Sequence, residues 1–131
     1  MQPIYQNIKE LVAPEGLKLL QDENRIEILP LQFARGITMN KSFVIVDECQ
    51  NLTVEQTKML LTRLGKYSQM VFAGDQKQID LQYKKDSGLS KLYEMQKYVD
   101  EIGFFELKEN HRHPVVDKIL NYMEGDKIIK S

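Results

Sequence analysis

The chain has 131 residues, of which 42% are hydrophobic and 28% are charged, and its net charge is −1. Its length suits one domain with a modest core, its charge excludes a globally basic nucleic-acid surface, and its single cysteine, Cys49, excludes an intrachain disulfide or a multi-cysteine metal site. It has no apolar stretch near the roughly 20 residues that span a bilayer and no signal-peptide pattern, so we expect a cytoplasmic protein without a membrane partner.

The N-terminal part of the chain predicts two helices and one strand. Apolar residues recur at helical spacing over residues 3–12, and the Ala-Pro-Glu-Gly stretch at 13–16 is expected to end that helix. A short helix is predicted within 17–24. Residues 25–31 alternate between apolar and polar side chains, which is typical of a β-strand. The loop at 32–40 then leads to the central part of the chain.

Two apolar stretches in the centre predict buried strands. Residues 43–47 read Phe-Val-Ile-Val-Asp, and residues 69–73 read Gln-Met-Val-Phe-Ala. Short apolar runs of this kind favour strands covered on both faces, as in parallel sheets. Between them, Thr53 and Gln56 form the pattern of a helical capping box, and Gly65 is a suitable helix stop.

The C-terminal third predicts two more helices and another strand. Ser87 is a candidate N-cap, residues 103–107 read as a strand, and Pro114 suits the first turn of a last helix. The tail at 125–131 is expected to be frayed. Strands that alternate with helices predict an α/β fold in which flanking helices cover a layered, mostly parallel sheet, within a single domain over residues 1–131.

Acidic residues follow the first central strand directly. Asp47 and Glu48 stand where the apolar run ends, and Gly74 and Asp75 follow the next strand. In parallel sheets the carboxyl ends of strands meet at one edge, where ligands bind, so these residues predict a divalent metal and a phosphate-bearing ligand. Gly74 would permit close approach of the backbone to that ligand. The alternative is that the acids only open a solvated loop.

Four stretches carry a resemblance to a known family. VIVDECQN at 44–51 and VFAGDQKQID at 71–80, together with PLQFARGITMN upstream and ENHRHPVV downstream, resemble the PhoH family of P-loop NTPases, which is related to superfamily 1 helicases. The resemblance covers essentially the whole chain and implies a partial P-loop NTPase fold. The phosphate-binding loop GxxxxGK[ST] does not occur in the sequence, so we expect a domain truncated at its N-terminal side.

The resemblance implies roles for the residues that follow the first strand. It implies that Asp47 holds Mg²⁺ and that Glu48 polarises the attacking water. Gln50 and Gln78 match glutamines that would sense the terminal phosphate of ATP, because an amide can donate to phosphate and accept from water.

Further roles follow from the resemblance on other elements. It implies that Asp75 is a supporting acid beside the metal, with Gly74 next to the nucleotide. Arg112 matches an arginine that would stabilise the transferring phosphoryl group. Arg35 matches a loop arginine that would bind phosphate, and the alternative is a surface arginine paired with a local acid.

Two functions remain open on the sequence. The first is the ATP- and Mg²⁺-binding part of an ATPase that supplies the acids and is inactive without a phosphate-loop segment. The second is a non-catalytic binding or assembly module derived from such an NTPase and associated with RNA or DNA. The expected partners are a nucleoside triphosphate and either the missing segment or other copies of the chain, with nucleic acid supported by family analogy alone.

Overall fold

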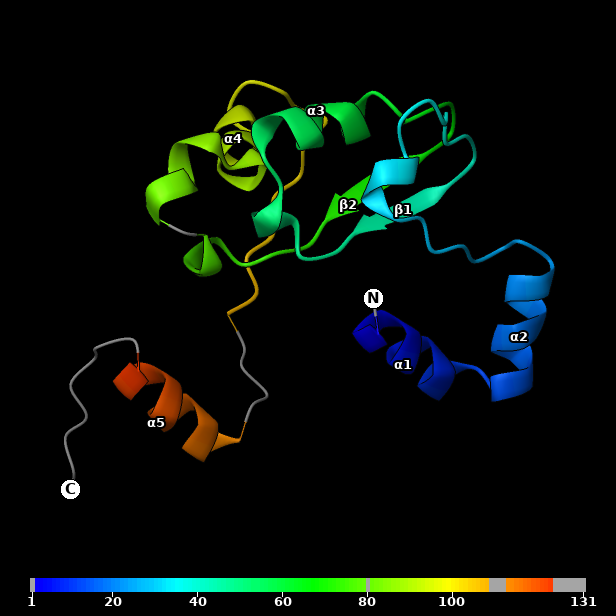
Figure 1. The fold of residues 1–131 in the computed structure, drawn as a ribbon, viewed down its shortest axis with the longest axis horizontal. Helices are drawn as coiled ribbons and strands as arrows, with labels where there is room; N and C mark the ends of the chain where they lie inside the picture. Colours follow the sequence, from blue (N-terminus) through cyan, green and yellow to red (C-terminus); the bar gives the residue numbers. More distant parts are fainter. Residues whose placement is uncertain (1, 80, 109–112, 124–131) are drawn as a thin grey trace.

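The computed structural model describes residues 2–79, 81–108 and 113–123. Its helices and strands, coloured along the chain in Figure 1, are α1 (Gln2–Leu11), α2 (Pro14–Asp22), β1 (Phe43–Val46), α3 (Val54–Leu61), β2 (Gln69–Phe72), α4 (Gly88–Met95) and α5 (Pro114–Met123). Short 3-10 turns lie at Leu31–Phe33, Cys49–Asn51, Gln76–Gln78 and Leu81–Asp86. Within the described residues, no helix combines the length and apolar character needed to cross a membrane.

A small parallel sheet lies at the centre of the fold. Strands β1 and β2 pair in parallel, with Phe43 opposite Gln69 and Val46 opposite Phe72. Because parallel neighbours need a crossover, α3 connects them, and the unit is the βαβ arrangement of an α/β fold. The predicted fold class and the presence of the two central strands are confirmed. The expectation that both faces of these strands are covered is wrong, because one face of the sheet is exposed at Phe43, Ile45 and Val71.

The predicted strands at 25–31 and 103–107 are wrong. In both ranges the described backbone forms no strand. The N–H groups of Arg25 and Ile26 instead donate to the carbonyl of Leu20, at 2.8 and 3.2 Å, and close the C-terminal end of α2. A strand-like sequence becomes a strand only where a neighbouring strand can take its hydrogen bonds, and among the described residues neither range pairs with one.

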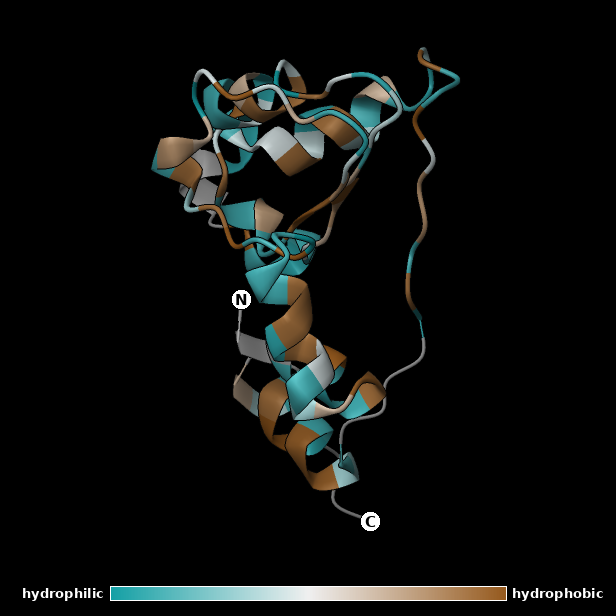
Figure 2. Cartoon of the chain, turned by 90° about the vertical axis from the view of Figure 1, so that its right-hand side faces the viewer, coloured by the Kyte–Doolittle hydropathy of each residue, from teal (hydrophilic) through white to brown (hydrophobic). Residues whose placement is uncertain are grey.

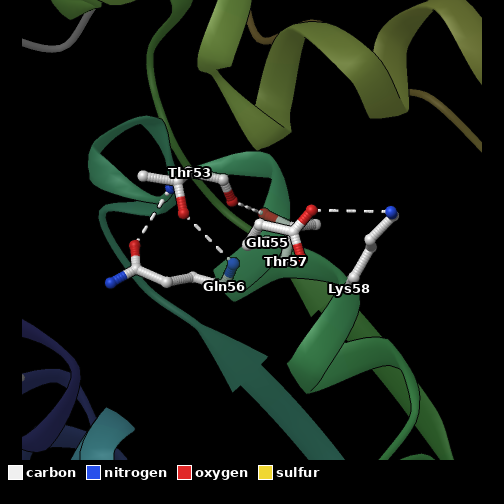
Figure 3. A network of polar contacts seen from close by, with 5 residues as sticks. All are labelled: Thr53, Glu55, Gln56, Thr57 and Lys58. Carbon is white, nitrogen blue, oxygen red and sulfur yellow. Dashed lines mark hydrogen bonds and ion pairs between the residues drawn. The ribbon is translucent and has the colours of Figure 1, made fainter.

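Helix α3 begins where the capping box predicted it. Figure 3 shows the N–H of Gln56 donating to Thr53 Oγ1 at 3.1 Å, while Gln56 Oε1 accepts from the N–H of Thr53 at 3.0 Å. One turn further, Lys58 and Glu55 form an exposed ion pair at 3.6 Å. The helix ends at Leu61, four residues before the predicted stop at Gly65. The capping box thus fixes how the chain leaves β1.

The closest helix packing is between α3 and α4. Ser87 caps α4, as predicted, with its hydroxyl accepting from the N–H of Ser90 at 3.4 Å. The next residue, Gly88, is buried, and a β-carbon there would lie 2.7 Å from Thr57 Cβ and 2.9 Å from the carbonyl oxygen of Thr53. Only glycine therefore lets α4 approach α3 this closely.

The outer helices stand apart from this centre. Figure 1 shows α1, α2 and α5 away from the two strands, and Figure 2 shows apolar stretches along the helices in the lower half of the molecule. Helix α2 starts at Pro14, inside the stretch expected to end α1. Helix α5 begins at Pro114 as predicted, and its apolar residues are largely uncovered, with Ile119 52% exposed. The predicted frayed tail at 125–131 lies outside the described residues.

Candidate functional site

The chain segments after β1 and β2 lie side by side. The N–H of Ala73 donates to the carbonyl of Val46, and the N–H of Cys49 donates to the carbonyl of Ala73, each at 2.9 Å. The parallel pairing therefore continues past both strands. It brings Asp47 and Glu48 to the same edge of the sheet as Asp75, and we call these three residues the acid edge.

Gln50 joins the two strand ends. Its side chain is buried, with 6% of its surface exposed. Gln50 Oε1 accepts from the N–H of Asp75 at 3.2 Å. Gln50 Nε2 donates to a carboxylate oxygen of Glu48 and, at 3.4 Å, to Gln78 Oε1. The amide oxygen and both amide hydrogens are thus directed at protein groups, whereas the resemblance assigned them to the terminal phosphate.

Gly74 makes room for that buried amide. A β-carbon at Gly74 would lie 2.6 Å from Gln50 Oε1 and 2.8 Å from Cys49 Sγ. Real side chains do not approach so closely, so any larger residue would push Gln50 out of its place. The structure thus shows that packing against Gln50 and Cys49 requires glycine at position 74. The sequence had indicated only a turn that lets the backbone approach a ligand.

Each acid of the acid edge is held by a nearby donor. Asp47 is half-buried, and its Oδ1 accepts from the N–H of Glu48 at 3.0 Å. Asp75 accepts from the N–H of Lys77 at 2.9 Å and from Gln78 Nε2 at 3.4 Å. Because donors fix these carboxylates, they are oriented before any ligand arrives.

Glu48 has an unusual backbone conformation. Its φ is 52°, in the left-handed region that residues with a β-carbon rarely adopt. Such a conformation costs of the order of 1–2 kcal/mol, and in folded proteins it concentrates at functional sites. It turns the chain out of β1 into the Cys49–Asn51 turn, and the exposed Glu48 carboxylate stays bonded to Gln50.

The acid edge is not a preformed metal cage. Across the residues that the structure describes, no three histidine, cysteine, aspartate or glutamate side chains converge as metal ligands. Mg²⁺, however, is commonly held by one or two carboxylates, with water and substrate phosphates completing its shell. The oxygen-only donors of Asp47 and Asp75 fit that mode of binding.

Cys49 is a buried residue beside the acid edge and has a structural role there. It is 1% exposed, and burial raises the pKa of its thiol to about 11. The nearby charges of Asp47 and Glu48 act in the same direction, while a backbone hydrogen bond lowers the value. A thiol with this pKa is protonated and unreactive near neutral pH. Cys49 therefore packs as a small buried hydrophobic side chain.

The structure describes only one of the two arginines predicted for the site. Arg112 lies outside the described residues. Arg35 is grouped with the exposed side of α3, where it lines a cavity of about 440 Å³. The cavity is lined by Arg35, Glu55, Gln56, Lys58, Met59, Thr62 and Arg63. The sequence reading singled out neither the cavity nor Arg63, because its members come from segments that no local pattern connects.

Comparison with known proteins gives one consistent result. The family model described as PhoH-like protein matches residues 1–124. A PhoH-like protein of Bacillus subtilis is 41% identical over 122 residues, covering 92% of this chain and 38% of that protein. A PhoH-like protein of Synechocystis is 40% identical over 126 residues, covering 95% and 38%. Protein PhoH of Escherichia coli is 40% identical over 95 residues, covering 71% and 27%. The chain therefore spans about two fifths, or less, of the length of these relatives.

Proposed function

The chain belongs to the PhoH family, and from this premise we propose that its acid edge is the Mg²⁺-binding and water-activating part of an ATP-hydrolysing site. The observation that carries the proposal is the buried Gln50 amide, which ties the Glu48 carboxylate to the backbone of Asp75. It holds acids from two strand ends at one edge of a parallel sheet, which is where ligands of such sheets bind.

The position of each residue suggests its role in the proposed site. Asp47 is the metal ligand, since its half-buried carboxylate closes β1 and offers a hard oxygen donor. Bound Mg²⁺ neutralises negative charge on the phosphate oxygens of ATP. Glu48 is the base that accepts a proton from the attacking water, and Gln50 keeps its carboxylate in place. Gln78 is exposed and is the glutamine whose amide can reach the terminal phosphate.

Hydrolysis of ATP would also need a phosphate-binding loop and an arginine at the transferring phosphoryl group. The sequence contains no GxxxxGK[ST] segment, whose backbone N–H groups and lysine cradle the phosphates in related NTPases. We propose that another polypeptide segment supplies it, and that Arg112 stabilises the transferring phosphoryl group. The chain alone should therefore release phosphate from ATP no faster than its Glu48→Gln variant. Glu48-dependent turnover at the rate of complete NTPases would refute this part of the proposal.

A magnesium titration followed by amide NMR tests the site itself. In the wild type we expect shifts centred on residues 47, 48 and 75, with weak affinity because phosphates are absent. Asp47→Asn should abolish them. Asp22→Asn, which removes an exposed acid at the end of α2, should leave them unchanged. Equal shifts in wild type and Asp47→Asn would show that the metal does not bind there.

A second candidate function is assembly without catalysis. It is favoured by one face of the sheet, where Phe43 is 65%, Ile45 40% and Val71 37% exposed. Apolar strands exposed in this way invite association with another copy or with a missing segment. Light scattering at high concentration tests this function. A concentration-independent monomer for the wild type, identical to an Ile45→Lys variant, would contradict it.

A further inference from the structure

Residues 103–108 and helix α5 form an arm that leaves the centre of the fold, and we call it the C-terminal arm. Figure 1 shows this arm directed away from β1 and β2. Among the described residues, 103–108 make no backbone–backbone hydrogen bond. Phe105 and Leu107 are 89% and 93% exposed. A strand-like apolar segment is thus left without cover and without a backbone partner, which favours association with another strand.

An aromatic contact holds the start of the C-terminal arm. The ring of Phe104 packs edge-on against Tyr93 of α4, with ring centroids 4.9 Å apart and ring planes inclined by 75°. Edge-to-face pairs of this kind are favourable beyond the area that they bury. The contact places the beginning of the arm beside α4 and not beside β2. The arm therefore projects from its own chain instead of lying on its own sheet.

The sheet lacks the elements that the C-terminal arm carries. Helices α3 and α4 lie together on one side of the sheet (Figure 1), while Phe43, Ile45 and Val71 are uncovered on the other side. Within the described part of the chain, β2 pairs only with β1, so its second edge is free. Parallel sheets are normally covered on both faces. One more strand and one amphipathic helix would complete this sheet.

Helix α5 has the apolar face that such a cover needs. Val115, Ile119 and Tyr122 are exposed and recur at spacings of four and three, so they lie on one side of the helix. In the sequence, residues 109–113 separate α5 from the strand-like segment, and connections of this length are common between a strand and a helix. The C-terminal arm thus has the order of a βα unit.

We propose that the C-terminal arm docks on the sheet of a second copy of the chain, so that two copies exchange their arms. Residues 103–108 of one copy pair in parallel with the free edge of β2 in the other. Connections in parallel sheets are right-handed, and this rule places the strand that follows α4 beyond β2. Helix α5 then covers Phe43, Ile45 and Val71 of the other copy.

A second copy fits this surface because each chain carries one arm and one incomplete sheet. Reciprocal exchange therefore covers both arms and both sheets and leaves no docking surface open. Exchange of an identical element is a low-cost route to dimers. The inference rests on the second candidate function, assembly, and names its partner and its contacts. It depends on neither the metal nor the acids of the proposed ATPase site.

The test is sedimentation velocity of the whole chain over a range of concentrations, for the wild type and three variants. Leu107→Lys places a charge in the C-terminal arm at a fully solvated side chain, so the change should not affect folding. Leu11→Lys makes the same change on α1, at a residue that is 84% exposed. Ile45→Lys places the charge on the uncovered face of the sheet. NMR of an equal mixture of differently isotope-labelled chains then detects contacts between chains.

We expect a dimer whose dissociation constant is about tenfold higher in Leu107→Lys and in Ile45→Lys, which matches the loss of one buried apolar side chain, and unchanged in Leu11→Lys. Residues 103–108 of one chain should contact residues 69–72 of the other. The proposal is overturned if Leu107→Lys and Leu11→Lys associate alike, or if these contacts occur only within one chain. A dimer that only Ile45→Lys weakens would retain assembly and reject the exchange of arms, whereas a monomer at every concentration would reject both.

Discussion

Replacing Gln50 by alanine tests whether this side chain holds the two strand ends together. The buried amide makes three hydrogen bonds to protein groups: one from the N–H of Asp75, one to the carboxylate of Glu48 and one to Gln78. Truncation removes all three at once. It also leaves the buried space of an amide unfilled beside Gly74 and Cys49.

The expected loss of stability can be worked out from these contacts. A neutral hydrogen bond contributes about 1 kcal/mol and one to a charged group about 1.5–3 kcal/mol. Glu48 and Gln78 are exposed, so water replaces part of what they lose. We therefore expect Gln50→Ala to lower the free energy of unfolding by about 2–3 kcal/mol. Gln78→Ala removes weak contacts of 3.4 Å from an exposed residue and should cost less than about 0.5 kcal/mol.

Urea unfolding followed by far-ultraviolet circular dichroism measures both variants. The midpoint should fall clearly in Gln50→Ala and little in Gln78→Ala, with the same slope. Amide NMR of Gln50→Ala should show the largest changes at residues 48 and 75. A Gln50→Ala protein as stable as the wild type, or equal losses in both variants, would refute the bridging role of Gln50.

Three further predictions concern the supports of the site. Gly88→Ala should lower the free energy of unfolding by about 1–3 kcal/mol by forcing α4 away from Thr57, whereas Gly16→Ala, whose β-carbon would meet only an ordinary 3.5 Å contact, should not be destabilising; urea unfolding compares them. Thr53→Ala should cost about 1 kcal/mol by removing the cap of α3, and an unchanged unfolding midpoint would contradict the capping box. Because the pKa of Cys49 is raised from 9.0 to about 11, the folded thiol stays protonated while the unfolded thiol ionises, so stability should fall between pH 9 and 11 more steeply in the wild type than in Cys49→Ala. Equal pH profiles of the unfolding midpoint would show that this thiol titrates alike in both states.

The elements that the sequence predicted correctly are those with local signals. The apolar runs of β1 and β2, the capping box at Thr53, the N-cap at Ser87 and the start of α5 at Pro114 each depend on residues within one turn or one strand. The family was also readable, because its motifs are short and contiguous. The acid edge could be predicted as well, since parallel strands end on the same side of a sheet.

Only the tertiary structure decided which distant residues meet. The contact between Gln50 and Asp75 spans 25 positions and that between Gln50 and Gln78 spans 28, so no local pattern revealed that Gln50 faces inward. The same holds for Arg35, which the structure groups with Arg63 on the exposed side of α3.

The prediction of a strand at 25–31 was wrong for a related reason. Its alternating residues satisfy the local pattern, but a strand is stable only where a neighbour accepts its hydrogen bonds, and the backbone there bonds back to α2 instead. Local chemistry thus determined the type of most elements and the starting points of several of them. The partners of each polar group, and with them the arrangement of the candidate sites, were determined by packing between segments far apart in the chain.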